Sequence, residues 1–390
     1  MLVAAFIIVE GLAIWRTDFL RRSSWGDEGH FIETVCTFGA DMGPERIRDY
    51  REVTPPLIFM VYALWGRVVG FDPHDLRMLS ILFSFVVYVV FHRMLFTLFR
   101  NGATALYATA FLMINPYMLG TSIFVFTDMM TMVFVMVFIW AVFEELPLVT
   151  LAAAVCALLS RQYTVFMVMA AGLVFLLRFV LRRDRLSALM TGACAVSTLP
   201  LAALFFVWNG MAPPSGLAHW NPDGGFGFHF SYVSVYISMM TLYCLPLIFL
   251  AWKALFADKR ILLFSLFGGI YYIVFPIMPS KVTLEQTSHV TVGLFHRLIK
   301  IMAPGPIAEQ TALLVCFIFG LLVVIRIVRD GWKRIVEGDA DFTLFLDFSF
   351  VLFLLIMPFS YQNWEKYLLP LLPILFIRLL MLRRSAGWAE

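Results

Sequence analysis

Two adjacent acids, Asp27 and Glu28, followed closely by His30, are the residues of this chain whose types and spacing best suit proton transfer. They lie in a polar segment, residues 16–54, that comes directly after the first apolar run. One interpretation is a solvated loop in which Asp27 caps the start of a helix. The other is an acid/base centre at a membrane surface, where ionisable groups are often functional. These residues alone leave both interpretations open.

Further polar residues stand where apolar runs begin or end. The basic ones are Arg67, Arg77, Arg161, Lys281, Arg297, Lys300 and Lys366, and the acidic ones, besides the first pair, are Glu33, Asp128, Asp223, Glu285 and Glu365. An isolated Arg or Lys in such a position usually extends its charge to the membrane surface. A phosphate group needs several cations that converge. Aromatic and amide residues near the acids, as in Trp208-Asn209, suit a carbohydrate, although a single Trp more often belongs to an interfacial belt.

Common catalytic motifs are absent from the sequence. It contains no GxxxxGK[ST], GxGxxG, HExxH or GxSxG arrangement, so nucleotide-triphosphate, zinc-protease and serine-hydrolase functions lose support. The five cysteines form no CxxC pair and four of them lie in apolar runs, which argues against a disulfide or metal framework. The net charge of +3 is small, and no nucleic-acid partner is expected.

The composition indicates which elements position these residues. The chain has 390 residues, of which 61% are hydrophobic and 14% charged. Soluble globular domains are roughly 45–50% apolar and about 25% charged. The mean hydropathy of +0.87 points the same way. Because a lipid bilayer requires internally hydrogen-bonded backbone, we predict an all-α polytopic membrane protein.

The N-terminal half holds two segments that need separate interpretation. Residues 2–15 are apolar except for Glu10, and their arginines follow rather than precede them, so a retained spanning helix is predicted instead of a signal peptide. Glu10 then lies near a helix end or faces the bundle interior. Residues 55–70 begin with Pro55-Pro56 and are shorter than the about 20 residues of a full span. We predict an interfacial helix there.

The positive residues set the topology. If residues 55–70 do not cross, the basic loops 178–186, 253–260 and 326–342 all lie on the cytoplasmic side, as the positive-inside rule requires. The predicted spans after the first are 77–98, 104–119, 127–143, 148–160, 163–180, 187–208, 231–254, 261–278, 311–328, 343–359 and 366–382. This gives about 12 transmembrane helices in one domain over residues 1–390. Residues 16–76 and 279–310 form the long outer loops.

Four features together resemble the GT-C superfamily of integral-membrane glycosyltransferases, whose donor is a polyprenyl- or dolichyl-phosphate sugar. They are the acidic pair, the Pro55-Pro56-Leu57 start of the interfacial helix, Arg77 at the start of the next helix, and Asp128. Within the superfamily the chain is most similar to the dolichyl-phosphate-glucose alpha-1,2-glucosyltransferases that complete the N-glycan precursor. The motifs that carry this narrower resemblance are Leu76-Arg77, Phe126-Thr127-Asp128, Ser160-Arg161-Gln162, Val207-Trp208-Asn209-Gly210 and Glu365-Lys366-Tyr367-Leu368-Leu369-Pro370. Residues 279–289 depart from that family, so a prokaryotic relative acting on another glycan fits at least as well.

The resemblance implies inverting transfer of a hexose, with glucose expected, to a lipid-linked glycan on the outer or lumenal face. Asp27 is the expected base, with Glu28 second, and like-charge repulsion within the pair would raise the pKa of the base. The implied substrate-binding residues are His30, Arg77, Asp128, Arg161, Gln162, Asn209, Lys281, Arg297, Glu365 and Lys366. Four of these, Arg161, Lys281, Arg297 and Lys366, are the candidate phosphate ligands. No cofactor is required, although a metal ion is compatible. The expected membrane is the prokaryotic cytoplasmic membrane, with the endoplasmic reticulum as the alternative.

A transporter or lipid-glycan flippase is the competing class. It should place ionisable residues at mid-membrane on broken helices. Charges inside the predicted spans are few, mainly Glu10 and Arg378, while the acids gather on one predicted face. This asymmetry favours an enzyme that acts from one side. A non-catalytic scaffold ranks last because it leaves the acidic pair without a purpose.

Overall fold

The structure is a computed structural model, and it describes residues 1–18, 22–220, 227–287 and 290–385. Asp223, one of the acids named above, lies outside these residues. Of the described residues 81% are helical, and none of them forms a strand. The all-α prediction is therefore confirmed.

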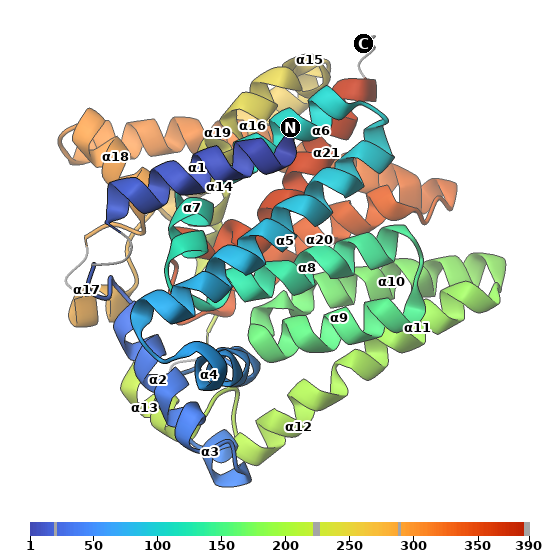
Figure 1. Cartoon of the computed structure of the whole chain (residues 1–390). Helices are drawn as coiled ribbons and strands as arrows, with labels where there is room; N and C mark the ends of the chain where they lie inside the picture. The colour runs from blue at the N-terminus through green and yellow to red at the C-terminus, as the bar shows by residue number, and fades with distance from the viewer. Residues whose placement is uncertain (19–21, 221–226, 288–289, 386–390) are drawn as a thin grey trace. The chain divides into compact units, whose positions relative to one another are not determined.

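The chain divides into two compact units, residues 1–168 with 189–224 and residues 169–188 with 225–390. The first unit contains α1 (Leu2–Thr17), α2 (Glu28–Ala40), α3 (Pro44–Arg48), α4 (Leu57–Val69), α5 (Pro73–Phe99), α6 (Gly102–Met113), α7 (Pro116–Ile123), α8 (Thr127–Phe143), α9 (Pro147–Ser160), η1 (Gln162–Thr164), α12 (Leu199–Trp208) and α13 (Pro214–Trp220) (Figure 1). The boundaries of the units fall within α10 (Val165–Arg182) and α11 (Arg185–Ser197). The single domain expected over residues 1–390 stays a prediction.

The second unit holds the remaining helices. They are α14 (Phe230–Leu250), α15 (Trp252–Phe256), α16 (Lys259–Val274), α17 (Lys281–Thr287), α18 (Leu294–Met302), α19 (Pro306–Glu337), α20 (Phe342–Ile356), η2 (Met357–Phe359), η3 (Glu365–Leu371) and α21 (Leu372–Ser385). Two short helices, α17 and α18, lie within the predicted second outer loop.

Several helices are long and apolar enough to cross a bilayer, which indicates a membrane-embedded protein. In the described part of the chain there are six of them, or up to seven if one bent pair counts as a span. They are Pro73–Phe99, Gln162–Arg182, Arg185–Trp208, Phe230–Leu250, Pro306–Glu337 and Phe342–Phe359. The expected number of about 12 is not confirmed. Helices α4, α6 and α9 are apolar but shorter, with 10–17 residues.

The predicted span 104–119 is divided between two helices, α6 and α7. Asn115 ends the first part of that segment, and its side-chain oxygen accepts hydrogen bonds from the amides of Tyr117 (3.1 Å) and Met118 (3.3 Å). Pro116 follows at the first position of α7, where its missing N–H costs nothing. Helix α7 then meets α8 at an angle of 111°. An N-cap and a proline within an apolar run therefore start a new helix that hydropathy alone does not reveal.

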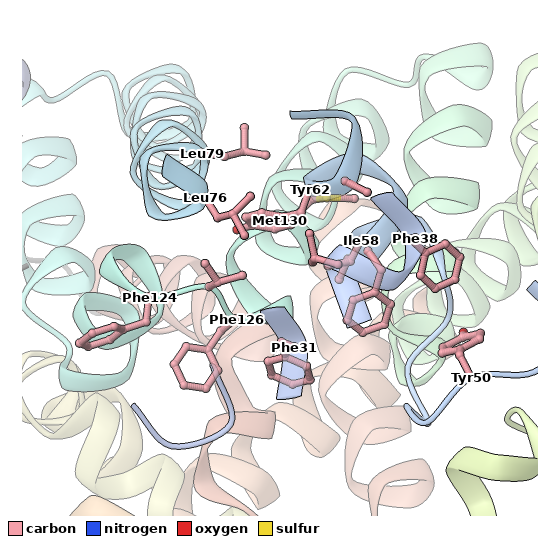
Figure 2. Close-up of a cluster of buried hydrophobic side chains, with 14 of the residues drawn as sticks. Phe31, Phe38, Tyr50, Ile58, Tyr62, Leu76, Leu79, Phe124, Phe126 and Met130 are labelled. Atoms are coloured by element: carbon pink, nitrogen blue, oxygen red, sulfur yellow. The ribbon is translucent and has the colours of Figure 1, made fainter. Parts of the chain in front are cut away.

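An aromatic core holds the polar N-terminal segment together. Helix α2 buries Phe31, Val35 and Phe38 at helical spacing. The Phe38 ring stacks on Phe59 of α4, with ring centroids 6.1 Å apart, and meets Tyr50 edge-on at 5.3 Å. Figure 2 shows this cluster. The predicted helix over 55–70 is thus present as α4, and the core fixes α2 and the segment around residue 50 beside it.

Candidate functional site

The two adjacent acids, Asp27 and Glu28, lie in different environments. Glu28, fully buried, accepts two hydrogen bonds from the guanidinium of Arg77, from Nε to Oε1 at 2.8 Å and from Nη2 to Oε2 at 2.7 Å. Two backbone amides also donate to this carboxylate, Val125 N to Oε1 (3.0 Å) and Trp25 N to Oε2 (3.1 Å). Arg77 also donates to the carbonyl oxygens of Arg22 (3.1 Å) and Ser23 (3.3 Å).

These contacts give Glu28 and Arg77 a structural role. Both carboxylate oxygens of Glu28 already accept hydrogen bonds, and the adjacent guanidinium compensates its charge. The expectation that Glu28 acts as second base is therefore not supported. The expected contact of Arg77 with substrate is not supported either, because its side chain is buried against Glu28 and the loop before α2.

Asp27 stands beside a histidine instead. It occupies the N-cap position of α2 without a side-chain cap hydrogen bond, and its side chain keeps 46% of its surface exposed. Its Oδ1 lies 3.8 Å from Nε2 of His30, one helical turn further on. Nδ1 of His30 lies 2.6 Å from Oε1 of Glu52, a buried acid on the following loop. Asp27, His30 and Glu52 thus form a row in which the histidine lies between two carboxylates.

This row controls the charge of the imidazole. Burial lowers the pKa of His30, but the neighbouring carboxylates of Asp27 and Glu52 outweigh it and raise the pKa from 6.5 to about 9. At neutral pH the ring is therefore protonated, and both nitrogens are donors. A buried acid that orients the far nitrogen of a histidine recurs in catalytic sites.

The raised pKa of His30 predicts a pH dependence of stability. Protonation favours the folded state, so the contribution is complete below pH 6.5 and is lost as the pH rises toward 9. Over that interval the free energy of unfolding should fall by up to about 3 kcal/mol. NMR titration of the imidazole should give a pKa near 9 in the native protein and a lower one in Glu52→Gln. An unchanged pKa in that variant would contradict the role of Glu52.

Four hydrogen bonds fix the loop that carries Glu52. Asp49 accepts from the backbone N (2.8 Å) and hydroxyl (2.6 Å) of Ser215 at the start of α13. Nε1 of Trp220 donates to the carbonyl of Arg51 at 2.9 Å. Gln162, a predicted substrate ligand, donates instead to the carbonyl of Val53 at 2.9 Å. The loop is thus held by α13 and by the start of η1.

The close approach of α13 to this loop yields a second prediction. A Cβ at Gly216 would lie 2.4 Å from the carbonyl oxygen of Glu52 and 2.7 Å from its carbon. Gly216→Ala must displace backbone, so we expect a loss of about 1–3 kcal/mol and a lower pKa of His30. Thermal unfolding with the same NMR titration tests this. Gly192→Ala is the control, because nothing lies within 4 Å of its Cβ; equal losses in both variants would refute the prediction.

A polar pocket of about 460 Å³ opens beside His30 and Glu52. Its lining comes from α2, from the segment 46–52 and from α13: His30, Glu33, Thr34, Thr37, Arg46, Asp49, Tyr50, Arg51, Glu52, Ser215, His219 and Trp220. Its size is within the about 300–1,000 Å³ of small-molecule sites. Asp27 is not among the lining residues but lies next to one of them, His30.

Three more predicted ligands belong to the same unit. Arg161 is buried against Asp128, with Nη2 3.3 Å from Oδ1, and donates to the hydroxyl of Thr127. The structure therefore brings Asp128 and Arg161 together at the start of α8, and their charges compensate each other. Asn209 is exposed and ends α12 in the left-handed conformation, which Asn adopts readily. Its place in the helix cap explains it without a ligand.

The other predicted ligands lie in the second unit. Glu365 is buried and accepts hydrogen bonds from the amides of Phe295 (3.0 Å) and His296 (2.8 Å) and from the hydroxyl of Tyr243 (3.1 Å), so it caps α18. Lys281 is exposed and lies 3.8 Å from Glu285. Arg297 is exposed as well, and Lys366 is half-buried. Their expected role at a phosphate stays a prediction.

Sequence reasoning missed Glu52 and Arg46, whereas Trp220 belongs to a Trp- and Asn-rich stretch of the kind that suits a carbohydrate. Glu52 is 22 positions from His30, and no local spacing connects them. The one available signal was an acid within the charged run Asp49-Tyr50-Arg51-Glu52 just before the apolar helix α4. A metal ligand set was not expected either, yet Asp72, His74 and Asp75 place one ligand atom each within 4.8 Å of one another. This group, in which Asp72 is exposed and His74 and Asp75 are half-buried, lies at the start of α5, where acids also favour the helix N-terminus.

Comparison of the chain with known protein families, with curated proteins and with solved structures finds no match. The fold and the site define the class of protein: an all-helical, membrane-embedded protein with a polar pocket beside a carboxylate–histidine–carboxylate row.

Proposed function

We propose that the protein is a membrane glycosyltransferase of the GT-C type, which moves a hexose from a polyprenyl- or dolichyl-phosphate sugar to a lipid-linked glycan. The observation that carries the proposal is the row Asp27–His30–Glu52 at the edge of a polar pocket. A partly exposed carboxylate next to a pocket suits a general base. The resemblance of the acidic pair, the Pro-Pro-Leu helix start and Arg77 to that superfamily supports the same class.

In the proposed reaction Asp27 transfers the proton, and the other residues of the site hold it in position. Asp27 takes the proton of the acceptor hydroxyl as the acceptor oxygen bonds to the anomeric carbon. The bond from that carbon to the phosphate oxygen breaks, and lipid phosphate leaves with the electron pair. Protonated His30 stabilises the Asp27 carboxylate before the reaction, and Glu52 holds the imidazole in place. Glu28 and Arg77 keep the start of α2 in position.

The test uses purified full-length protein in detergent with short-chain polyprenyl-phosphate glucose, mannose, galactose and arabinose. A glycolipid extract serves as the acceptor, and release of polyprenyl phosphate is measured. Acceptor-dependent release with one donor supports the function and names the sugar. No release with any of them, from protein with a cooperative unfolding transition, would refute the proposed transfer from these donors.

A transporter or lipid-glycan flippase is the second candidate, and one feature of the first unit favours it. Glu10 is buried in α1 and accepts a hydrogen bond of 3.0 Å from the hydroxyl of Ser122, close to the 111° bend between α7 and α8. A buried acid beside a broken helix is typical of transport sites. Flux of a fluorescent lipid-linked sugar in proteoliposomes, abolished in Glu10→Gln, would favour this class.

A further inference from the structure

The pocket lined by α2, residues 46–52 and α13 contains two donors that the described protein does not satisfy. Nε2 of His30 and Nε of Arg46 are buried and make no hydrogen bond to the described residues; Nε2 of His30 lies 3.8 Å from Oδ1 of Asp27, an ion-pair distance beyond that of a hydrogen bond. Both residues line the pocket. Leaving a buried donor unpaired is costly, so such atoms call for an explanation. An oxygen atom of a bound ligand would satisfy each of them.

The charges of the pocket indicate what kind of ligand this is. The lining contains three basic side chains, Arg46, Arg51 and protonated His30, and three acidic ones, Glu33, Asp49 and Glu52. Their charges balance, so the pocket selects neither an anion nor a cation by net charge. It offers donors and acceptors close together instead. A neutral molecule with many hydroxyl groups, each both donor and acceptor, matches this mixture.

One wall of the pocket is aromatic and held in place. The Trp220 ring lies 5.0 Å from the His30 ring, and its Nε1 donates to the carbonyl of Arg51 at 2.9 Å. This hydrogen bond fixes the orientation of the indole, which is half-buried. A fixed aromatic ring provides a flat apolar surface at little entropic cost. The C–H face of a sugar ring fits such a surface while its hydroxyls reach polar groups around the edge.

We propose that this pocket binds one or two neutral sugar units, with Trp220 packed against a sugar ring and with His30 and Arg46 donating to its hydroxyls. The inference rests on the proposed function in one respect, which is that a glycan bound beside Asp27 is the acceptor. The binding itself requires no donor substrate.

Binding of neutral gluco-, manno- and galacto-oligosaccharides to the full-length protein in detergent tests the proposal. Calorimetry, or the change of tryptophan fluorescence, should show saturable binding of at least one of them. Trp220→Ala and Arg46→Gln should each weaken it about tenfold or more, while Trp220→Phe, which keeps an aromatic ring, should lose less. Trp25→Ala is the matched control, a half-exposed tryptophan of the same unit that is not among the lining residues.

The possible results distinguish the proposed sugar binding from the proposed function. Binding of inorganic phosphate in place of neutral sugars would overturn the proposal, and so would the absence of any sugar binding by protein that unfolds cooperatively. Sugar binding that Arg46→Gln leaves unchanged would place the site elsewhere. If sugar binds here and no donor sugar is released in the donor panel, the proposed function fails and this inference stands. If release occurs and Arg46→Gln leaves the KM for the acceptor unchanged, the inference fails and the function stands.

Discussion

Asp27→Asn should lower the kcat of sugar transfer by about 100- to 10,000-fold, the range that a positioned general base contributes. Asparagine keeps the shape of the side chain but cannot accept the acceptor proton. The KM values should change little, because the substitution alters one partly exposed group at the start of α2. Release of polyprenyl phosphate with saturating donor and acceptor measures the effect, and thermal unfolding checks that the fold is kept.

Glu45→Gln is the control for this substitution. Glu45 is an exposed acid in the first turn of α3, in the same polar segment, and is not among the pocket-lining residues. Its variant should retain native turnover. Normal turnover in Asp27→Asn would rule out Asp27 as the base. Both carboxylate oxygens of Glu28 already accept hydrogen bonds from Arg77 and from two backbone amides. Substitutions of Glu28 should therefore lower the stability of the protein more than they lower kcat.

Arg77→Met should destabilise the protein by about 3–5 kcal/mol. The substitution leaves Glu28 buried with an uncompensated charge, and this costs more than the loss of a favourable contact. It also removes the donors to the carbonyl oxygens of Arg22 and Ser23. Thermal or denaturant unfolding in detergent measures the loss, and sugar transfer should fall along with the folded fraction.

A double substitution separates the two contributions. In Glu28→Gln/Arg77→Met no unpaired charge remains, so part of the lost stability should return. Lys281→Met is the control, because the Lys281–Glu285 pair is exposed and should contribute little. A loss in Arg77→Met no greater than in this control would show that the buried pair does not stabilise the first unit.

The sequence determined the features that depend on local chemistry. Composition predicted a helical membrane protein, and the apolar run 127–143 coincides with α8, because hydropathy over one helix is a property of neighbouring residues. The polar segment before α4, and Asp27 at a helix start, could likewise be predicted from local residue types. The prediction failed at residues 104–119, where Asn115 and Pro116 break the run at a position that average hydropathy does not register.

The tertiary structure decided which charges are paired. Asp27 and Glu28 are adjacent and chemically alike, yet one is buried against Arg77, 49 positions from Glu28, and the other lies beside His30 at a pocket. Glu52, the partner of that histidine, and Trp220, the wall of the pocket, come from distant segments joined only by the packing of α2, α4 and α13. Long-range pairing of this kind depends on the folded backbone, because spacing along the chain does not determine distance in space.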